Sequence, residues 1–387
     1  MRIPETMPYP SLANDNLPDV LRLIRTLNVG PVTFFQLIQR FGTAAKALAA
    51  LPDLSMRGGR KNPLVACPLE AAERELEAAG KYGARFIMYG APDYPALLHM
   101  LTDPPPVISV MGHPHVWHNR DMVALVGARN ASAHGCQFAQ KLARELGEAG
   151  LGVISGLARG IDTYVHKGSL PTGTVGVIAG GIDNVYPPEN AALFQQLRDT
   201  GAIISEQPFG MLPFSGSFPG RNRIIAGMSL GTIVVEAALK SGSLITARFA
   251  LDNNREVFAV PGSPADPRSK GCNMLIRQGA VLVESVGDVL QGLAPMRNKT
   301  FGENGPALYA NELAEAPMDE NELAHTRRAV IEKLGITAVP VDMLIEQCDA
   351  SAAAVITILL ELELAGRLKR SAGNKVYLTE IRAEELV

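Results

Sequence analysis

The chain has 387 residues, of which 47% are hydrophobic and 19% charged, a composition typical of globular proteins. This length exceeds what one ordinary core supports, so two or three domains are expected. The formal net charge of -3 excludes a polycationic surface, and any binding of nucleic acid must therefore come from a local basic patch.

Residues 1–112 are predicted to form an N-terminal helical domain and a connector. Residues 1–16 lack the basic and apolar regions of a signal peptide, and no later stretch has a membrane-spanning length, so we expect a cytoplasmic protein with no membrane partner. From 17 to 51, apolar residues recur at helical spacing around a break at 28–31, which is similar to helix-hairpin-helix and SAM modules. The hairpin amides can face phosphate, or the hairpin can serve packing alone, and both interpretations stay open.

Residues 113–292 are predicted to form an α/β domain, an extended Rossmann-like parallel sheet. The boundary before it follows a Gly/Pro-rich stretch, 90–112, whose three consecutive prolines oppose regular structure. Beyond it, short β-branched runs alternate with helical stretches, the pattern of a parallel sheet with helices on both faces. Loops at the carboxyl ends of such strands form the ligand crevice. The predicted strands are 123–126, 153–155, 175–179, 202–205, 232–235, 257–260 and 281–283.

Residues 293–320 are predicted to be a linker, since this stretch is polar and interrupted by Gly and Pro. Residues 321–387 are predicted to form a winged-helix domain of three helices and a hairpin. These elements are expected at 322–334, 341–347, 352–365 and 367–379.

The charge of the third predicted helix, 352–365, and of the hairpin after it indicates what the winged helix can bind. Residues 352–365 are apolar or acidic with no basic face, which argues against a helix that reads a major groove. The hairpin is nevertheless basic, with Arg367, Lys369, Arg370 and Lys375. Protein interaction and duplex DNA binding therefore both remain open for this domain.

The loops after the first two predicted strands carry arginines beside glycines. In the first loop, Arg129 adds charge and paired donors, and Ser132 can cap the helix that follows, which favours an anion. In the second loop, Arg159 lies in the sequence 155–162, which lacks the three-glycine spacing of a dinucleotide fingerprint. A nicotinamide cofactor is therefore not expected. The third loop, 180–190, shapes the crevice without a clear chemical role.

Basic residues gather in two segments, 218–227 and 240–248, against few acids. Arg221 and Arg223 lie at a helix start, and the Ser241-Gly242-Ser243 sequence offers free amides at the next, so the two loops can hold successive phosphates. Phe218 can stack on a base or belong to the core.

Several catalytic devices are missing from the sequence. There is no Gly-x-x-x-x-Gly-Lys-Ser/Thr loop and no carboxylate cluster for a nuclease metal. Glu236 can act as an acid or base, or can hold Arg221 or Arg248. We expect no enzyme activity, no metal and no cofactor. The histidines His113, His115 and His118 form one local cluster without carboxylate or cysteine support, which is more typical of a polar loop than of a metal site. The cysteines Cys67, Cys136, Cys272 and Cys348 are too far apart in the sequence to suggest a metal site.

Together, these motifs resemble the DNA-processing protein A family, DprA or Smf, of bacterial natural transformation. The resemblance runs from about 94 to 289 and rests on the sequences at 127–132, 155–162, 186–187, 218–223, 241–248 and 257–262. It implies an extended Rossmann domain that dimerises, coats incoming single-stranded DNA, and loads the RecA recombinase onto it without catalytic turnover.

By the same resemblance, Arg129 is the main phosphate-binding arginine. Members often carry a lysine shortly before the Phe-Pro step, whereas this chain has Pro213-Phe214-Ser215-Gly216-Ser217 there and lacks that phosphate contact. The DNA-binding residues expected are Arg129, Ser132, Arg159, Phe218, Arg221, Asn222, Arg223, Lys240, Ser241, Gly242, Ser243, Thr246 and Arg248.

Two other functions compete with strand binding. A nucleotide phosphoribohydrolase of the lysine decarboxylase-like Rossmann group uses a Gly-Gly-x-Gly-Thr-x-x-Glu loop, which Gly231, Thr232 and Glu236 only half match. A nucleotide-sensing module would hold a mononucleotide in the crevice as a regulator. Turnover of AMP would favour the first, and mononucleotide binding without strand binding the second.

Overall fold

The computed structural model describes residues 7–118, 120–297, 320–348, 350–371 and 373–379. The chain divides into two compact units. The sheet unit comprises residues 75–305 with 1–7, and the terminal unit comprises residues 8–74 with 306–387.

The sheet unit is built on one nine-stranded sheet with the order β1-β2-β6-β5-β4-β3-β7-β8-β9. From β6 to β9 all neighbours run parallel, which confirms the predicted parallel sheet. All five residues of β3 are buried, as expected for a strand covered on both faces. The parallel strands are β3 (Met122–Val126), β4 (Gly152–Ser155), β5 (Thr174–Val177), β6 (Ala202–Ser205), β7 (Gly231–Val234), β8 (Glu256–Ala259) and β9 (Val281–Leu282).

The two first strands extend this sheet and were not predicted. β2 (Val107–Gly112) pairs antiparallel with β6, and β1 (Arg85–Met88) pairs antiparallel with β2. The predicted boundary at residue 112 thus assigns to a connector two strands that belong to the sheet. The three prolines at 104–106 end just where β2 begins, so they precede the strand without interrupting its ladder.

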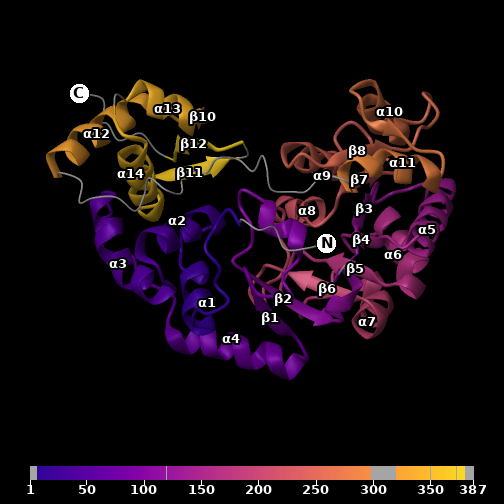
Figure 1. Ribbon diagram of the computed structural model, residues 1–387, viewed down its shortest axis with the longest axis horizontal. Helices are drawn as coiled ribbons and strands as arrows, with labels where there is room; N and C mark the ends of the chain where they lie inside the picture. Colours follow the sequence, from indigo (N-terminus) through magenta and orange to yellow (C-terminus); the bar gives the residue numbers. More distant parts are fainter. Residues whose placement is uncertain (1–6, 119, 298–319, 349, 372, 380–387) are drawn as a thin grey trace. The chain divides into compact units, whose positions relative to one another are not determined.

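Helices alternate with the parallel strands and cover them, and Figure 1 shows α5, α6 and α7 beside β3 to β6. The chain passes from β3 to β4 on one side and reaches β7 on the other, so β3 and β7 meet at a topological switch point. Side chains of α5 and α11 pack with β3 and β7 in one buried core. The helices are α5 (Ala133–Glu148), α6 (Ile161–Ser169), α7 (Ala191–Thr200), α8 (Ser217–Gly227), α9 (Gly242–Asp252), α10 (Lys270–Arg277) and α11 (Val286–Arg297).

The terminal unit contains two small domains from opposite ends of the chain. α1 (Leu17–Arg25), α2 (Pro31–Phe41) and α3 (Ala44–Arg57) form the N-terminal helical domain, and α4 (Leu69–Tyr82) runs on into the sheet unit. Asn16 caps α1 and Thr43 caps α3 through their side chains.

The C-terminal domain has the predicted winged-helix elements, three helices and a small sheet of order β10-β12-β11. Its elements are α12 (Glu320–Lys333), β10 (Val339–Pro340), α13 (Val341–Gln347), α14 (Ala352–Leu364), β11 (Leu368–Ser371) and β12 (Lys375–Leu378). Helix α11 continues to Arg297, past the start of the predicted linker, and most of that linker, 298–319, lies outside the described residues. Across the described ranges, no helix is long and apolar enough to span a membrane.

A buried histidine in the sheet unit makes stability depend on pH. His166 on α6 is fully buried, and its Nδ1 lies 2.9 Å from the Thr174 hydroxyl, which itself donates to the Val153 carbonyl. Burial, with a smaller effect of Arg221, lowers the pKa of His166 from 6.5 to about 3. The unfolded chain therefore binds more protons than the folded one between these two values.

We expect the free energy of unfolding to fall as the pH is lowered from about 6.5, because the unfolded state takes up the extra proton. A single such group contributes a slope of up to about 1.4 kcal/mol per pH unit. Urea denaturation between pH 7 and pH 5 measures that slope. His166→Gln should make it shallower, with the remainder due to His99, whose pKa burial lowers to about 4. His134→Gln, a change at an exposed position of α5, should leave it as in the wild type. Equal slopes in all three proteins would contradict the assignment.

Candidate nucleic-acid interface

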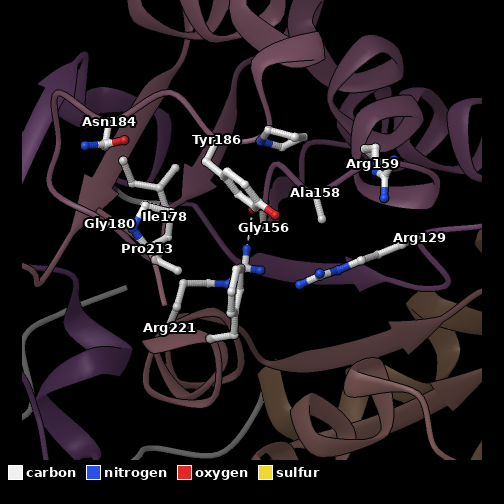
Figure 2. A pocket seen from close by; sticks show the side chains of 13 residues that line it. Arg129, Gly156, Ala158, Arg159, Ile178, Gly180, Asn184, Tyr186, Pro213 and Arg221 are labelled. Carbon is white, nitrogen blue, oxygen red and sulfur yellow. Dashed lines mark hydrogen bonds between the residues drawn. The ribbon is translucent and has the colours of Figure 1, made fainter. Parts of the chain in front are cut away.

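A pocket opens at the carboxyl ends of β3, β4 and β5, as expected for a doubly wound sheet. Figure 2 shows Arg129 and Arg221 reaching into it from different elements, with Tyr186 close by. The loops after the three strands supply most of the lining, and α8 with the loop before it supplies the rest. The lining residues are Arg129, Gly156, Ala158, Arg159, Ile178, Ala179, Gly180, Asn184, Tyr186, Pro187, Pro213, Phe218 and Arg221.

A cation and two aromatic rings lie together in this pocket. The guanidinium carbon of exposed Arg129 lies 4.7 Å from the centroid of the Phe218 ring. The Tyr186 ring follows, with its centroid 6.1 Å from that of Phe218. Phe218 is only half-buried, so it is not a core aromatic. The pocket thus combines donors suited to phosphate with flat faces suited to bases.

Arg221 supplies positive charge from the floor of the pocket. Its side chain is buried and donates to the carbonyls of Gly156 and, at 3.0 Å, Val177. Burial lowers the pKa of Arg221 to about 10, which still leaves it charged at neutral pH, and burial raises the pKa of nearby Asp162. A side chain at Gly156 would collide with the Arg221 guanidinium, so this close approach requires glycine.

Arg223, predicted to bind phosphate, does not line the pocket. Its guanidinium pairs with Glu206 and, at 3.4 Å, with Asp103, and its side chain is 8% exposed. The two carboxylates outweigh the effect of burial and raise the pKa of Arg223. We therefore replace the predicted phosphate contact with a structural role, in which Arg223 ties α8 to the residues after β6 and before β2.

The predicted anion site at the start of α5 is filled by the protein's own carboxylate. Ser132 caps α5, accepting from the Gly135 amide at 2.9 Å. Its own amide and hydroxyl donate to Glu236 at 2.9 and 2.5 Å. Glu236 thus satisfies the amino end of α5, and the interactions predicted for it with Arg221 and Arg248 are not those observed. Ser132 is not among the residues that line the pocket.

The second basic segment lies at the start of α9, outside the pocket lining. Ser241 caps α9, and its hydroxyl lies 2.7 Å from that of Ser243. Asn222 on α8 donates to the Gly242 carbonyl at 3.4 Å, which joins this loop to the helix that carries Arg221. Thr246 and Ser243 are buried, whereas Lys240, Gly242 and Arg248 are exposed.

Two further pocket residues differ in how well the sequence predicted them. Arg159, expected at the site, lines the pocket and is exposed, with Glu189 4.0 Å away. Tyr186 was not selected, because its loop gave only turn residues. The structure shows it 47% exposed in the pocket, where its ring lies next to that of Phe218.

The described residues contain no group of His, Cys, Asp or Glu side chains arranged to hold a metal ion. Within the local histidine cluster, His113 and His118 hydrogen-bond to the backbone carbonyls of Asp199 and Pro92. These histidines therefore serve loop packing.

The chain was compared with known protein families. The family described as DNA recombination-mediator protein A matches residues 85–294, more than half of the chain. The chain belongs to this family. The DprA-like N-terminal HHH domain matches residues 14–78, and the DprA winged helix domain matches residues 314–374. The resemblance found in the motifs is thereby confirmed, as is the three-domain fold class.

Individual members of the DprA family show the same similarity. Protein Smf of Escherichia coli (strain K12) is 38% identical over 288 residues, which cover 74% of this chain and 75% of that protein. DNA processing protein A from Streptococcus pneumoniae has a solved structure with a TM-score of 0.60 and 31% identity, covering 72% of this chain and 98% of that one. The structure of DNA processing protein A from Helicobacter pylori, described for its single-stranded DNA binding mode, gives a TM-score of 0.51 and 28% identity. The match covers 55% of this chain and 96% of that one.

Proposed function

We propose that this DprA-family chain binds single-stranded DNA in the pocket beyond β3, β4 and β5 and hands the strand to the RecA recombinase. The observation that carries the proposal is the placement of Arg129 over Phe218 in an open pocket. A cation and an aromatic face in contact suit a phosphate and its neighbouring base at the same time. The single-stranded DNA binding of the Helicobacter pylori relative supports it.

Each pocket residue has a distinct task in this proposal. Arg129 and Arg159 are exposed and bind phosphates as they pass. Phe218 and Tyr186 stack on bases without selecting among them, because every base has an aromatic face. Arg221 remains fixed to backbone carbonyls and contributes charge from below. Lys240 and Arg248 then extend the basic track along α9.

The hydrogen bonds of Glu236 argue against the competing phosphoribohydrolase function. A phosphoribohydrolase would use Glu236 as its catalytic carboxylate, yet both oxygens of Glu236 accept hydrogen bonds from Ser132. We therefore propose binding without turnover, and incubation with AMP should release no ribose phosphate. Binding of mononucleotides without binding of strands would instead favour the nucleotide-sensing alternative.

The delivery step and the assembly state also belong to the proposal. We propose a cytoplasmic homodimer formed through the sheet unit, which places two strand-binding pockets in one particle. RecA assembly on DNA coated with single-strand-binding protein, followed through RecA ATP hydrolysis, should begin sooner when this protein is added. An unchanged lag would limit the function to strand binding.

Fluorescence anisotropy of a labelled oligo-dT strand tests the binding itself. We expect binding that weakens steeply as the salt concentration rises, because phosphate contacts release counterions. Oligo-dA and mixed strands should bind with similar affinity. Absence of binding by the wild type at low salt would overturn the proposed function.

Loss of the Phe218 ring should weaken binding of every strand. Phe218→Leu keeps an apolar side chain but removes the stacking face, which contributes about 1 to 3 kcal/mol per base, or about 5- to 150-fold in affinity. Tyr164→Leu, an aromatic change on α6 outside the pocket lining, is the matched control and should bind as the wild type does. Equal losses in both variants would contradict a stacking role for Phe218.

A further inference from the structure

Helix α14 of the winged helix is buried on two faces. One face, including Val355, Leu359 and Leu362, belongs to the core of its own domain. The other carries Leu360, Glu361 and other side chains that are also buried but lie outside that core. Since a helix that is buried all round must be covered on both faces, a second partner covers α14.

The partner is the N-terminal helical domain of the same chain. Helix α14 contacts α3 and α2. The contact is close at the end of α3, where an added side chain at Gly58 would collide with the Glu361 carbonyl and with Ala365. At the other helix, Arg370 donates to the Gln36 side chain at 3.3 Å.

Charged and polar groups fix this contact in one arrangement. Arg327 on α12 pairs with buried Glu361 and also donates to the Arg57 carbonyl at the end of α3. Arg40 on α2 faces the same carboxylate, which partly offsets the lowering of its pKa by burial. A buried Glu361 without these cations would be an uncompensated charge, so the network favours this partner over an apolar surface of similar shape.

The hairpin of the N-terminal domain is held in the same contact. Asn28, in the loop between α1 and α2, donates to the Leu364 carbonyl at the end of α14 at 3.3 Å. That loop is the part of a helix-hairpin-helix module that would face phosphate, and α14 is the helix that a winged helix would place in a major groove. Each domain therefore occupies the surface with which the other would bind DNA.

We infer that the winged helix is a protein-binding module whose ligand is this chain's own N-terminal helical domain, and that neither domain binds duplex DNA in this state. Strand binding is then left to the sheet unit. The inference rests on α14 and α3 and is independent of the proposed strand-binding pocket.

Hydrogen exchange of the full-length chain, followed by mass spectrometry, tests the contact with Gly58→Leu. The backbone at Gly58 has φ -69° and ψ -2°, which any residue adopts, so leucine acts only as a wedge between the domains. We expect exchange in 352–364 and at the end of 44–57 to become about 5- to 150-fold faster, the range that overpacking gives. Peptides from α1 and β12 should remain protected, since each domain keeps its own core. Gly80→Leu, at an exposed position of α4 where a side chain meets open space, is the matched control and should exchange as the wild type does in these segments.

Unchanged protection of α14 and α3 in Gly58→Leu would overturn the inference. If α1 also loses protection, the N-terminal domain has unfolded, and a second variant is needed. Arg370→Ala removes the hydrogen bond from the winged helix to Gln36 without changing the N-terminal domain itself. Faster exchange in α3 without a change in α1 supports the contact, and no change refutes it. Slower exchange of α14 in the wild type on adding duplex DNA would show DNA to be the ligand and would also refute it.

Discussion

Replacing Arg223 with alanine should lower the free energy of unfolding by about 3 to 5 kcal/mol, the cost of breaking a buried ion pair by removing one partner. The side chain of Glu206 is 14% exposed, so the variant would remove the guanidinium that faces this carboxylate near the core. Urea denaturation at pH 7 measures the loss. Arg248→Ala is the matched control, because Arg248 is 76% exposed and lies 3.9 Å from Asp252. Exposed pairs of this kind contribute about 0 to 1 kcal/mol.

The same variant separates structure from binding. Under conditions where Arg223→Ala remains folded, its affinity for oligo-dT should stay within about twofold of the wild type, since Arg223 does not line the pocket. A large loss of affinity with unchanged stability would restore the phosphate contact predicted from the sequence.

Replacing Arg129 with alanine should weaken binding of single-stranded DNA by about 10- to 150-fold, as expected for hydrogen bonds to a charged partner worth about 1.5 to 3 kcal/mol. The loss should be the same for every base sequence, because phosphates carry no sequence information. The slope of affinity against salt concentration should also become shallower. Anisotropy titrations of oligo-dT and oligo-dA at two salt concentrations measure both effects.

Arg144→Ala removes the same charge from α5 outside the pocket lining, where Arg144 is paired at 3.8 Å with Glu148. It should bind as the wild type does. An equal loss in both variants would assign the effect to net charge and not to the pocket, and a loss confined to one base sequence would contradict a phosphate contact.

The parallel strands could be predicted from the sequence because each is a short β-branched run between helical stretches. The two antiparallel strands were missed for local reasons. β1 has four residues of mixed exposure, so it lacks a clear periodicity. β2 follows three prolines, which favour the prediction of a loop, and its long-range pairing with β6 is invisible to a local pattern.

The pocket lies where the sequence analysis expected the ligand crevice, but the partners of its arginines were not predicted. Arg221 and Arg223 are two residues apart on α8, which turns their side chains to nearly opposite sides of the helix. One reaches the pocket floor and the other reaches Glu206. A basic cluster in the sequence therefore did not become a basic cluster in space. Tyr186 was missed for the converse reason, since only the folded loop brings it to Phe218.

The winged helix shows what composition can and cannot indicate. The apolar character of 352–365 argued against a helix that reads a groove, and the structure shows most of α14 buried. Composition could not identify the domain that packs on this helix, because Glu361 interacts with Arg40, which lies more than 300 residues earlier in the chain. Only tertiary structure distinguishes such a buried carboxylate from one on a solvated face.

The bond between Glu236 and Ser132 has a consequence for which molecules this fold can accept. In doubly wound sheets that bind dinucleotides, the pyrophosphate rests on the first helix after the switch point. Here that helix is α5, and a resident carboxylate already occupies its amino end. A diphosphate arriving there would have to displace a negative charge held by two hydrogen bonds from Ser132. The amino end of α5 is therefore blocked for the diphosphate of a dinucleotide. An anion bound by this fold would instead meet the arginines of the neighbouring pocket, Arg129, Arg159 and Arg221.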